Sequence, residues 1–150
     1  MKTAIIAAAI GLALASPALA DDKGREVEAV MRQYLTLWNA GDAATITKQI
    51  YRFDNPANPM QSEAGLAANF ADLKKQGYDK STMASINGCL LTDTSALAEM
   101  RFTRWKTDGT PLGPKDRVSL YVLRKFPDGW RVTSMVGMDV SARLNCASKG

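Results

Sequence analysis

Two aromatic residues and a nearby acidic residue are the first candidates for chemistry in this chain. Tyr34 and Trp38 are four positions apart, so a helix would present both on one face, and Asp42 follows shortly after. The Tyr34 hydroxyl can donate a hydrogen bond, and the Trp38 ring offers a broad apolar surface. The same pair is typical of core packing. We therefore expect these aromatics to serve both as core and as the wall of a pocket.

Acid–base chemistry at Tyr34 would need a proton acceptor nearby, and Asp54 is the candidate. The next residue, Asn55, precedes Pro56, and its neutral amide cannot take up a proton. Neighbouring side chains in an extended segment point to opposite faces, so only one of Asp54 and Asn55 can face a pocket. Tyr34 and Asp54 are thus the catalytic candidates, and Asn55 is a candidate for the pocket lining.

The sequence contains no histidine, which narrows the possible reactions. This excludes Ser-His-Asp and Cys-His catalysis, histidine-bound zinc and the usual general base near neutral pH. Two cysteines far apart in the sequence do not form a zinc site either. We expect no metal and no cofactor.

Further apolar residues fall where they either line a cavity or fill a core. These candidates are Met60, Phe70, Met100 and Phe102. Arg104 shares a strand face with Met100 and Phe102, where it could hold a ligand carboxylate or extend its charged end into water. Together with the aromatics of the first helix, these residues form the predicted pocket.

Residues 1–20 have the pattern of a secretory signal peptide. Lys2 comes first, an apolar run over residues 4–15 follows, and a small-residue cleavage site ends at Ala20. The run is too short for a membrane span, which needs about 20 residues. We expect cleavage, a single domain over residues 21–150, and a periplasmic or secreted location. An uncleaved anchor is the alternative.

The two cysteines and the charge balance are consistent with export. An exported chain with an even cysteine count usually forms disulfides, so we predict a Cys89–Cys146 bridge, with free thiols or an intermolecular link as alternatives. The net charge is +4, and loss of Lys2 leaves 4 − 1 = +3. Basic and acidic residues are interspersed, so nucleic-acid binding is not implied. We expect no membrane contact after cleavage.

Periodicity predicts a chain of helices followed by strands. The predicted helices are residues 25–40, 43–50 and 63–76, and the predicted strands are residues 78–87, 95–106, 117–126 and 130–139. Residues 51–55 are expected to be extended. Separate runs of helices and strands favour an α+β fold with a curved antiparallel sheet. Because both faces of the last strands are apolar, we expect a homodimer formed through the sheet.

This order of elements resembles the NTF2-like superfamily of cone-shaped domains. The step W38-N-A-G-D42 is similar to the family's junction between its first two helices, and D128-G-W-R-V132 is similar to its closing hairpin. The likeness spans about residues 25–138. It implies a pocket between the helices and the concave face of the sheet.

The superfamily includes SnoaL-like cyclases, ketosteroid isomerases and scytalone dehydratases. In the isomerases, a tyrosine eight residues before the aspartate of the Gly-Asp step stabilises an oxyanion, and Tyr34 matches that spacing to Asp42. Their general base is an aspartate directly before a proline, where this chain has Asn55. The sequence therefore departs from the catalytic pattern at the base.

These observations favour an exported, non-catalytic NTF2-like domain. It would bind a small, mostly apolar molecule in its cone or act as an interaction module. The first alternative is a cofactor-independent isomerase or dehydratase that uses Tyr34 and Asp54. The second is a structural or secretion-associated adaptor with a filled cone.

Overall fold

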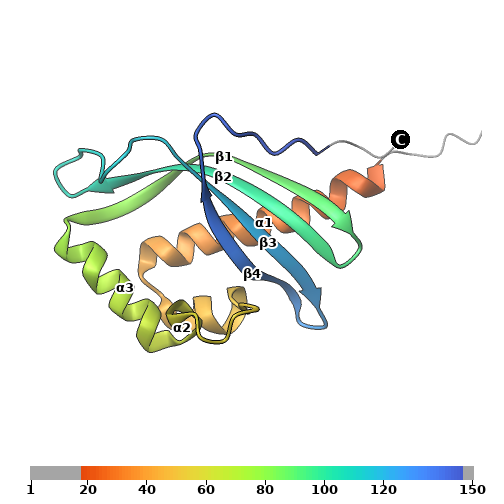
Figure 1. The fold of residues 1–150 in the computed structure, drawn as a ribbon, viewed down its shortest axis with the longest axis horizontal. Coiled ribbons are helices and arrows are strands. Elements are labelled where there is room, and N and C mark those ends of the chain that lie inside the picture. The colour runs from red at the N-terminus through yellow and green to blue at the C-terminus, as the bar shows by residue number, and fades with distance from the viewer. Residues whose placement is uncertain (1–17, 147–150) are drawn as a thin grey trace, which may run out of the picture.

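The computed structural model describes residues 18–146, and the side chains from Gly24 onward. Most of the predicted signal peptide, residues 1–17, lies outside the described residues. Within the described part, three α-helices pack against one side of a curved antiparallel sheet of four strands, in the order β1-β2-β3-β4 (Figure 1). The predicted α+β architecture is confirmed.

The boundaries of the elements are as follows. The helical segments are α1 (Ala18–Ala40), α2 (Ala43–Thr45), a π-helical turn (Ile46–Ile50), a 3-10 turn (Pro59–Gln61) and α3 (Glu63–Lys75). The strands are β1 (Tyr78–Thr92), β2 (Ser95–Lys106), β3 (Arg117–Phe126) and β4 (Gly129–Met138).

Helix α1 buries one stripe of its surface against the sheet. Val27, Met31, Tyr34 and Trp38 are all buried and recur at helical spacing, as predicted. The helix begins at Ala18, earlier than the predicted Arg25. No helix of the described region is long and apolar enough to cross a membrane.

The second predicted helix is helical but not uniformly α-helical. After α2, the backbone N–H of Tyr51 donates to the carbonyl of Ile46, which closes a wider π-helical turn. The Thr47 hydroxyl donates to the Ala43 carbonyl at 2.8 Å, so it competes for a helical acceptor. Asp42 caps this segment by accepting a hydrogen bond from the Thr45 N–H.

Strand β1 continues past residue 87, where the predicted strand ends. Gly88 interrupts the apolar pattern of the sequence, but it does not end the strand. Gly88 lies directly beneath α1, and a Cβ atom there would be 2.8 Å from the carbonyl oxygen of Gly24. The absence of a side chain therefore permits the helix and strand backbones to touch. The Gly88 N–H also donates to Glu28 Oε1 at 3.2 Å.

The other end of α1 is fastened to β1 by one amide side chain. Asn39 Nδ2 donates to the Ser81 carbonyl at 2.9 Å, and Asn39 Oδ1 accepts from the Ser81 N–H at 2.8 Å. The Tyr78 hydroxyl donates to the same oxygen at 3.0 Å. Gly41 then takes a positive φ of 66°, which turns the chain away from α1.

The extended segment that follows the π-helical turn runs parallel to β4. The Arg52 N–H donates to the Val132 carbonyl at 2.9 Å, and the Asp54 N–H donates to the Thr133 carbonyl at 3.0 Å. Side chains alternate along this segment, so Tyr51 is buried while Asp54 is exposed.

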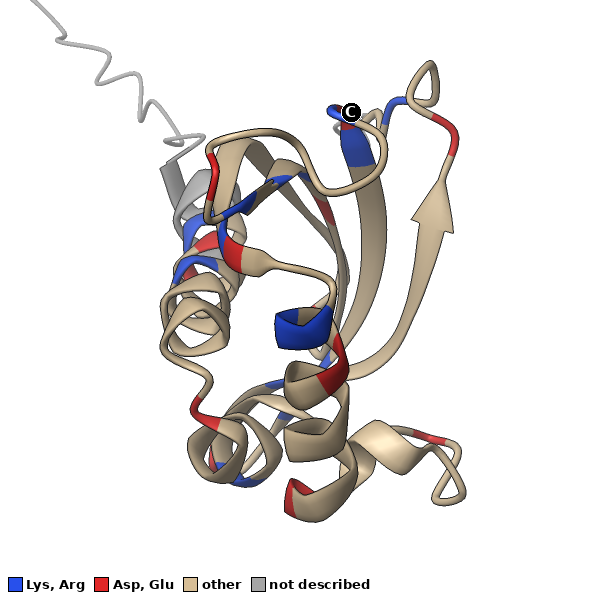
Figure 2. Cartoon of the chain, turned by 90° about the vertical axis from the view of Figure 1, so that its left-hand side faces the viewer, with Lys and Arg blue, Asp and Glu red and all other residues tan. Residues whose placement is uncertain are grey.

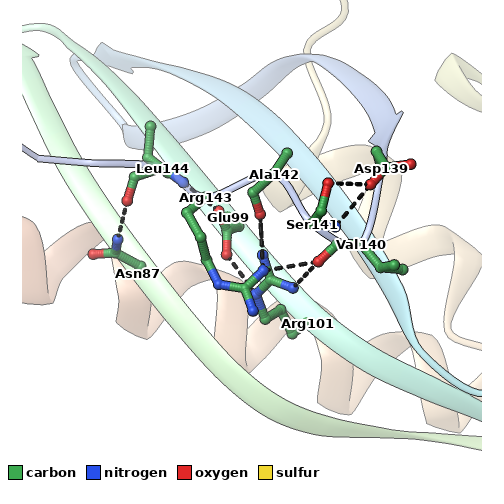
Figure 3. A network of polar contacts seen from close by, with 9 residues as sticks. All are labelled: Asn87, Glu99, Arg101, Asp139, Val140, Ser141, Ala142, Arg143 and Leu144. Carbon is green, nitrogen blue, oxygen red and sulfur yellow. Dashed lines mark hydrogen bonds and ion pairs between the residues drawn. The ribbon is translucent and has the colours of Figure 1, made fainter.

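The segment after β4 crosses the face of the sheet opposite the helices (Figure 3). Glu99 on β2 is buried there, on the face of the sheet opposite the cavity. Its carboxylate accepts from Arg101 Nε at 2.7 Å and from the Leu144 N–H. Arg101 also donates to the carbonyls of Val140 and Ala142. Main-chain groups of this segment therefore complete a buried ion pair.

A disulfide between Cys89 and Cys146 fixes the end of the same segment to β1, as predicted. The bridge spans 57 positions of the sequence, so it closes a large loop. Charges of both signs are interspersed over the helices and strands, as the sequence indicates (Figure 2).

Loss of this disulfide should destabilise the fold. Replacing both cysteines, C89S with C146S, should lower the free energy of unfolding by about 2–4 kcal/mol, because the unfolded chain regains the freedom of a long loop. Urea denaturation of the two proteins measures the difference. Reductant should destabilise the wild type to a similar degree and leave the double variant unchanged. Equal stability of all three samples would contradict the prediction.

Candidate functional site

A cavity of about 150 Å3 lies between α1, α3 and the inner face of the sheet. Its position is that of the pocket implied by the cone-shaped fold. The lining comprises Tyr34, Leu35, Trp38, Met60, Asn69, Ser81, Met100, Phe102, Arg104, Ser119, Tyr121 and Met135. Of the described residues that line it, none is an aspartate or a glutamate.

The cavity exists because large side chains hold α1 away from the sheet at this end. The Tyr34 and Trp38 rings meet edge-on at 5.6 Å between centroids, and Phe70 packs edge-on against Trp38 at 4.8 Å. On the sheet side, Met100 and Phe102 form the facing wall. The surface offered to a ligand is therefore largely apolar and aromatic.

Three tyrosines form a hydrogen-bonded and aromatic cluster at this site. The Tyr51 hydroxyl donates to the Tyr34 hydroxyl at 2.9 Å. The Tyr34 ring lies 5.7 Å from both the Tyr51 and the Tyr121 rings, measured between centroids. Tyr34 also has a side-chain hydrogen bond with Tyr121, so the three phenols form one hydrogen-bonded network.

The phenols of this cluster stay protonated because they are buried. Burial raises the pKa of Tyr34 well above its ordinary value, and the neighbouring Tyr121 and Tyr51 raise it further. Burial likewise raises the pKa of Tyr51 and of Tyr121. These groups can donate hydrogen bonds to a ligand, but they are not bases near neutral pH.

Arg104 is the cationic group of the cavity. Its guanidinium carbon lies 5.7 Å from the centroid of the Trp38 ring and 5.9 Å from that of Phe102. Both distances are within the range of cation–π attraction. Two buried polar atoms of the lining, Arg104 Nε and Asn69 Oδ1, have no hydrogen-bond partner among the described residues.

The structure brings together most of the pocket residues suggested by the sequence. Six predicted residues line one cavity: Tyr34, Trp38, Met60, Met100, Phe102 and Arg104. Phe70 supports this wall from behind through Trp38 and is outside the lining.

Two predicted site residues lie outside the cavity. Asp54 points to solvent, with 55% of its side chain exposed, and its Oδ2 lies 3.5 Å from Arg124 Nη2. Asn55 is also exposed, and its Oδ1 accepts from the Ala57 N–H in a tight turn. The inward position of this segment belongs to Phe53 instead. Tyr34 and Asp54 therefore do not share a cavity, which corrects the proposed catalytic pair.

The sequence analysis did not identify several residues that line or support the cavity. Tyr121 lies on the inner face of β3, and its alternation with Leu120 and Val122 was the available signal. Asn69 and Ser119 gave no signal, because polar residues in a helix or strand are usually solvated. Tyr51 meets Tyr34 through an extended segment whose partner strand comes much later in the chain.

Comparison with known proteins agrees with this architecture. A family profile described as an NTF2-like protein (DUF6841) matches residues 25–140. No curated protein sequence matches the chain.

Solved structures with the same architecture come from several bacteria. An NTF2-like protein with a cystatin-like fold from Novosphingobium aromaticivorans has a TM-score of 0.57 and 17% identity over 77% of this chain and 80% of its own. An NTF2-like superfamily protein from Salmonella enterica has a TM-score of 0.56 and 21% identity over 87% and 98%. A ketosteroid isomerase-like protein from Erwinia carotovora has a TM-score of 0.53 and 18% identity over 77% and 94%. At these identities the likeness establishes the fold.

The buried phenols predict a strong dependence of stability on alkaline pH. All four tyrosines have raised pKa values in the folded state, Tyr78 also through burial. Their contribution to stability is therefore complete below the unfolded pKa of about 10 and is lost as the pH rises through the folded values. Tyrosinate absorbance should therefore appear only at a pH above the ordinary pKa of tyrosine. The protein should unfold over the same pH range, as measured by circular dichroism.

The control for this titration is the protein in denaturant, where all four phenols should ionise near their ordinary pKa. A phenol of the tyrosine cluster that ionises normally in the folded protein would contradict the assigned burial.

Proposed function

Because the chain belongs to the NTF2-like family DUF6841, we propose that its cone is a non-catalytic binding site for one small, mostly apolar molecule. The observation that carries the proposal is the cavity of about 150 Å3, with aromatic and methionine walls. An apolar cavity of about this volume holds a molecule the size of benzene. The ligand is accordingly a single ring or a compact aliphatic group.

The absence of a general base inside the cavity favours binding over catalysis. An isomerase of the kind considered above needs a carboxylate within hydrogen-bond reach of the bound substrate. No described residue of the lining supplies one, and Asp54 pairs with Arg124 outside. The cavity itself argues against an adaptor with a filled cone.

We also propose that the protein is exported and acts in the periplasm or outside the cell. The signal pattern of residues 1–20 supports this location, and so does the disulfide, since such bonds persist in oxidising compartments.

A second copy of the chain is the proposed partner on the outer face of the sheet. Met135 lines the cavity, so Val136 points to the opposite face, where 57% of it is exposed. Leu120 is its cross-strand partner, and Val140 follows nearby with 49% exposure. Two copies would remove this apolar strip from water.

Filling the cavity should abolish ligand binding without unfolding the protein. Wild-type protein is expected to bind benzyl alcohol, seen as heat by isothermal titration calorimetry and as a raised melting temperature. Ser119→Leu places an isobutyl group in the cavity and should remove both signals. Ser85→Leu, at an exposed position on β1, should bind like the wild type. Unchanged binding by Ser119→Leu would place the ligand elsewhere, and no binding by the wild type would refute the proposed pocket.

Native mass spectrometry tests the dimer and the export together. Protein expressed with residues 1–20 and recovered from the periplasm should lack them and have the mass of a dimer. Val136→Glu should give monomers, because it buries a charge at the interface. The control, Ala44→Glu, changes an exposed position of α2 on the helical side of the sheet and should remain dimeric. A monomeric wild type would refute the dimer, and a retained leader in the cytoplasm would refute export.

A further inference from the structure

Arg104 is a half-buried cation of the cavity lining that forms no ion pair with a described acidic residue. Its Nε–H group is shielded from solvent and has no acceptor among the described residues. The rings of Trp38 and Phe102 lie close to the guanidinium and limit where it can move. A buried donor without an acceptor costs free energy, so this group is incomplete until an acceptor enters the cavity.

A second arginine on the same face strengthens the positive potential. Arg117 on β3 is the cross-strand partner of Phe102, and such partners project from the same face of a sheet. Its Nη2 donates to the Leu112 carbonyl at 2.8 Å, while its Nε is buried without a partner in the described region. Burial lowers the pKa of Arg117, and the positive charge of Arg104 lowers it further.

The two guanidinium groups are not neutralised by the protein. Neither forms an ion pair with any carboxylate that the structure describes. The exposed arginine at the other end of β3, Arg124, by contrast pairs with Asp54. The Nε–H group of each arginine is a buried donor without an acceptor in the described region, and an anion in the cavity would supply the acceptor.

We propose that Arg104 binds the carboxylate of the pocket's ligand, which is therefore a small organic acid with an apolar body. Arg117, on the neighbouring strand β3, adds a second positive charge. The aromatic and methionine walls receive the apolar body, and the arginine determines which end of the molecule faces it. This assignment rests on the proposed function and adds the chemical class of the ligand.

Benzoate and benzyl alcohol test the assignment, because they have similar shapes and differ in charge. By isothermal titration calorimetry at neutral pH, the wild type should bind benzoate about ten- to hundredfold more tightly than benzyl alcohol. Arg104→Gln should remove this preference, so that benzoate and benzyl alcohol bind with similar affinity. Arg104→Lys should retain part of it, since the charge remains but the planar donor set is lost. The control, Arg124→Gln, should behave like the wild type.

A salt series on the wild type gives a readout that needs no variant. Added sodium chloride should weaken benzoate binding and leave benzyl alcohol binding unchanged. Circular dichroism melting shows whether Arg104→Gln is folded, and if it is not, the salt series and Arg104→Lys decide the question.

The outcomes separate this inference from the proposed function. Equal affinity for the two probes, insensitive to salt and to residue 104, would overturn the carboxylate assignment while the apolar pocket stands. Failure of both probes to bind would overturn both.

Discussion

The close approach of α1 to β1 at Gly88 determines the geometry of the whole cone. At that point the carbonyl of Gly24 would clash with any side chain on the strand, so the two backbones are nearly in contact. Two turns or more along the same helix, Tyr34 and Trp38 stand between helix and sheet. The helix and the sheet therefore form a wedge, closed by small residues at one end and opened by large ones at the other. The cavity is the space that remains at the open end.

The same wedge decides where charge can lie. At the narrow end the inner strand positions are the small residues Ala96 and Ala98, which leave no cavity between helix and sheet. At the wide end the polar groups are phenols, amides, hydroxyls and one arginine, and the carboxylate of Glu99 lies on the opposite face of its strand. The described lining of the cavity thus carries the positive charge of Arg104 and no carboxylate. Such an interior suits recognition of an apolar acid better than transfer of a proton.

Alternation and capping patterns were enough to predict most of the architecture. β2 and β3 have the predicted bounds because their side chains alternate strictly between two turn-rich flanks. β1 was underestimated, since Gly88 weakens the strand pattern for a tertiary reason that no local window contains. Likewise, the wider π-helical turn at residues 46–50 was not predicted, because the helical spacing of apolar residues does not distinguish it from an α-helical turn.

Site residues could be predicted only where the direction of a side chain follows from the helix or strand that contains it. Arg104 faces the cavity because strand alternation places it beside Phe102. Asp54 and Asn55 depend on how an extended segment docks, and its parallel pairing with β4 places Phe53 inward before the chain turns. The contact between Tyr34 and Tyr51 requires that same docking. Long-range pairing of short segments is what the sequence pattern does not contain.

That parallel pairing has a further consequence for the behaviour of the sheet in solution. β4 is an edge strand, and edge strands expose backbone groups on which other chains can assemble. Residues 51–54 occupy part of this edge and use up its carbonyls at Val132 and Thr133. The opposite edge, β1, carries three register irregularities, which twist a strand and make it a poor template. The fold thus protects an open sheet against edge-to-edge aggregation by two different means, without closing it into a barrel.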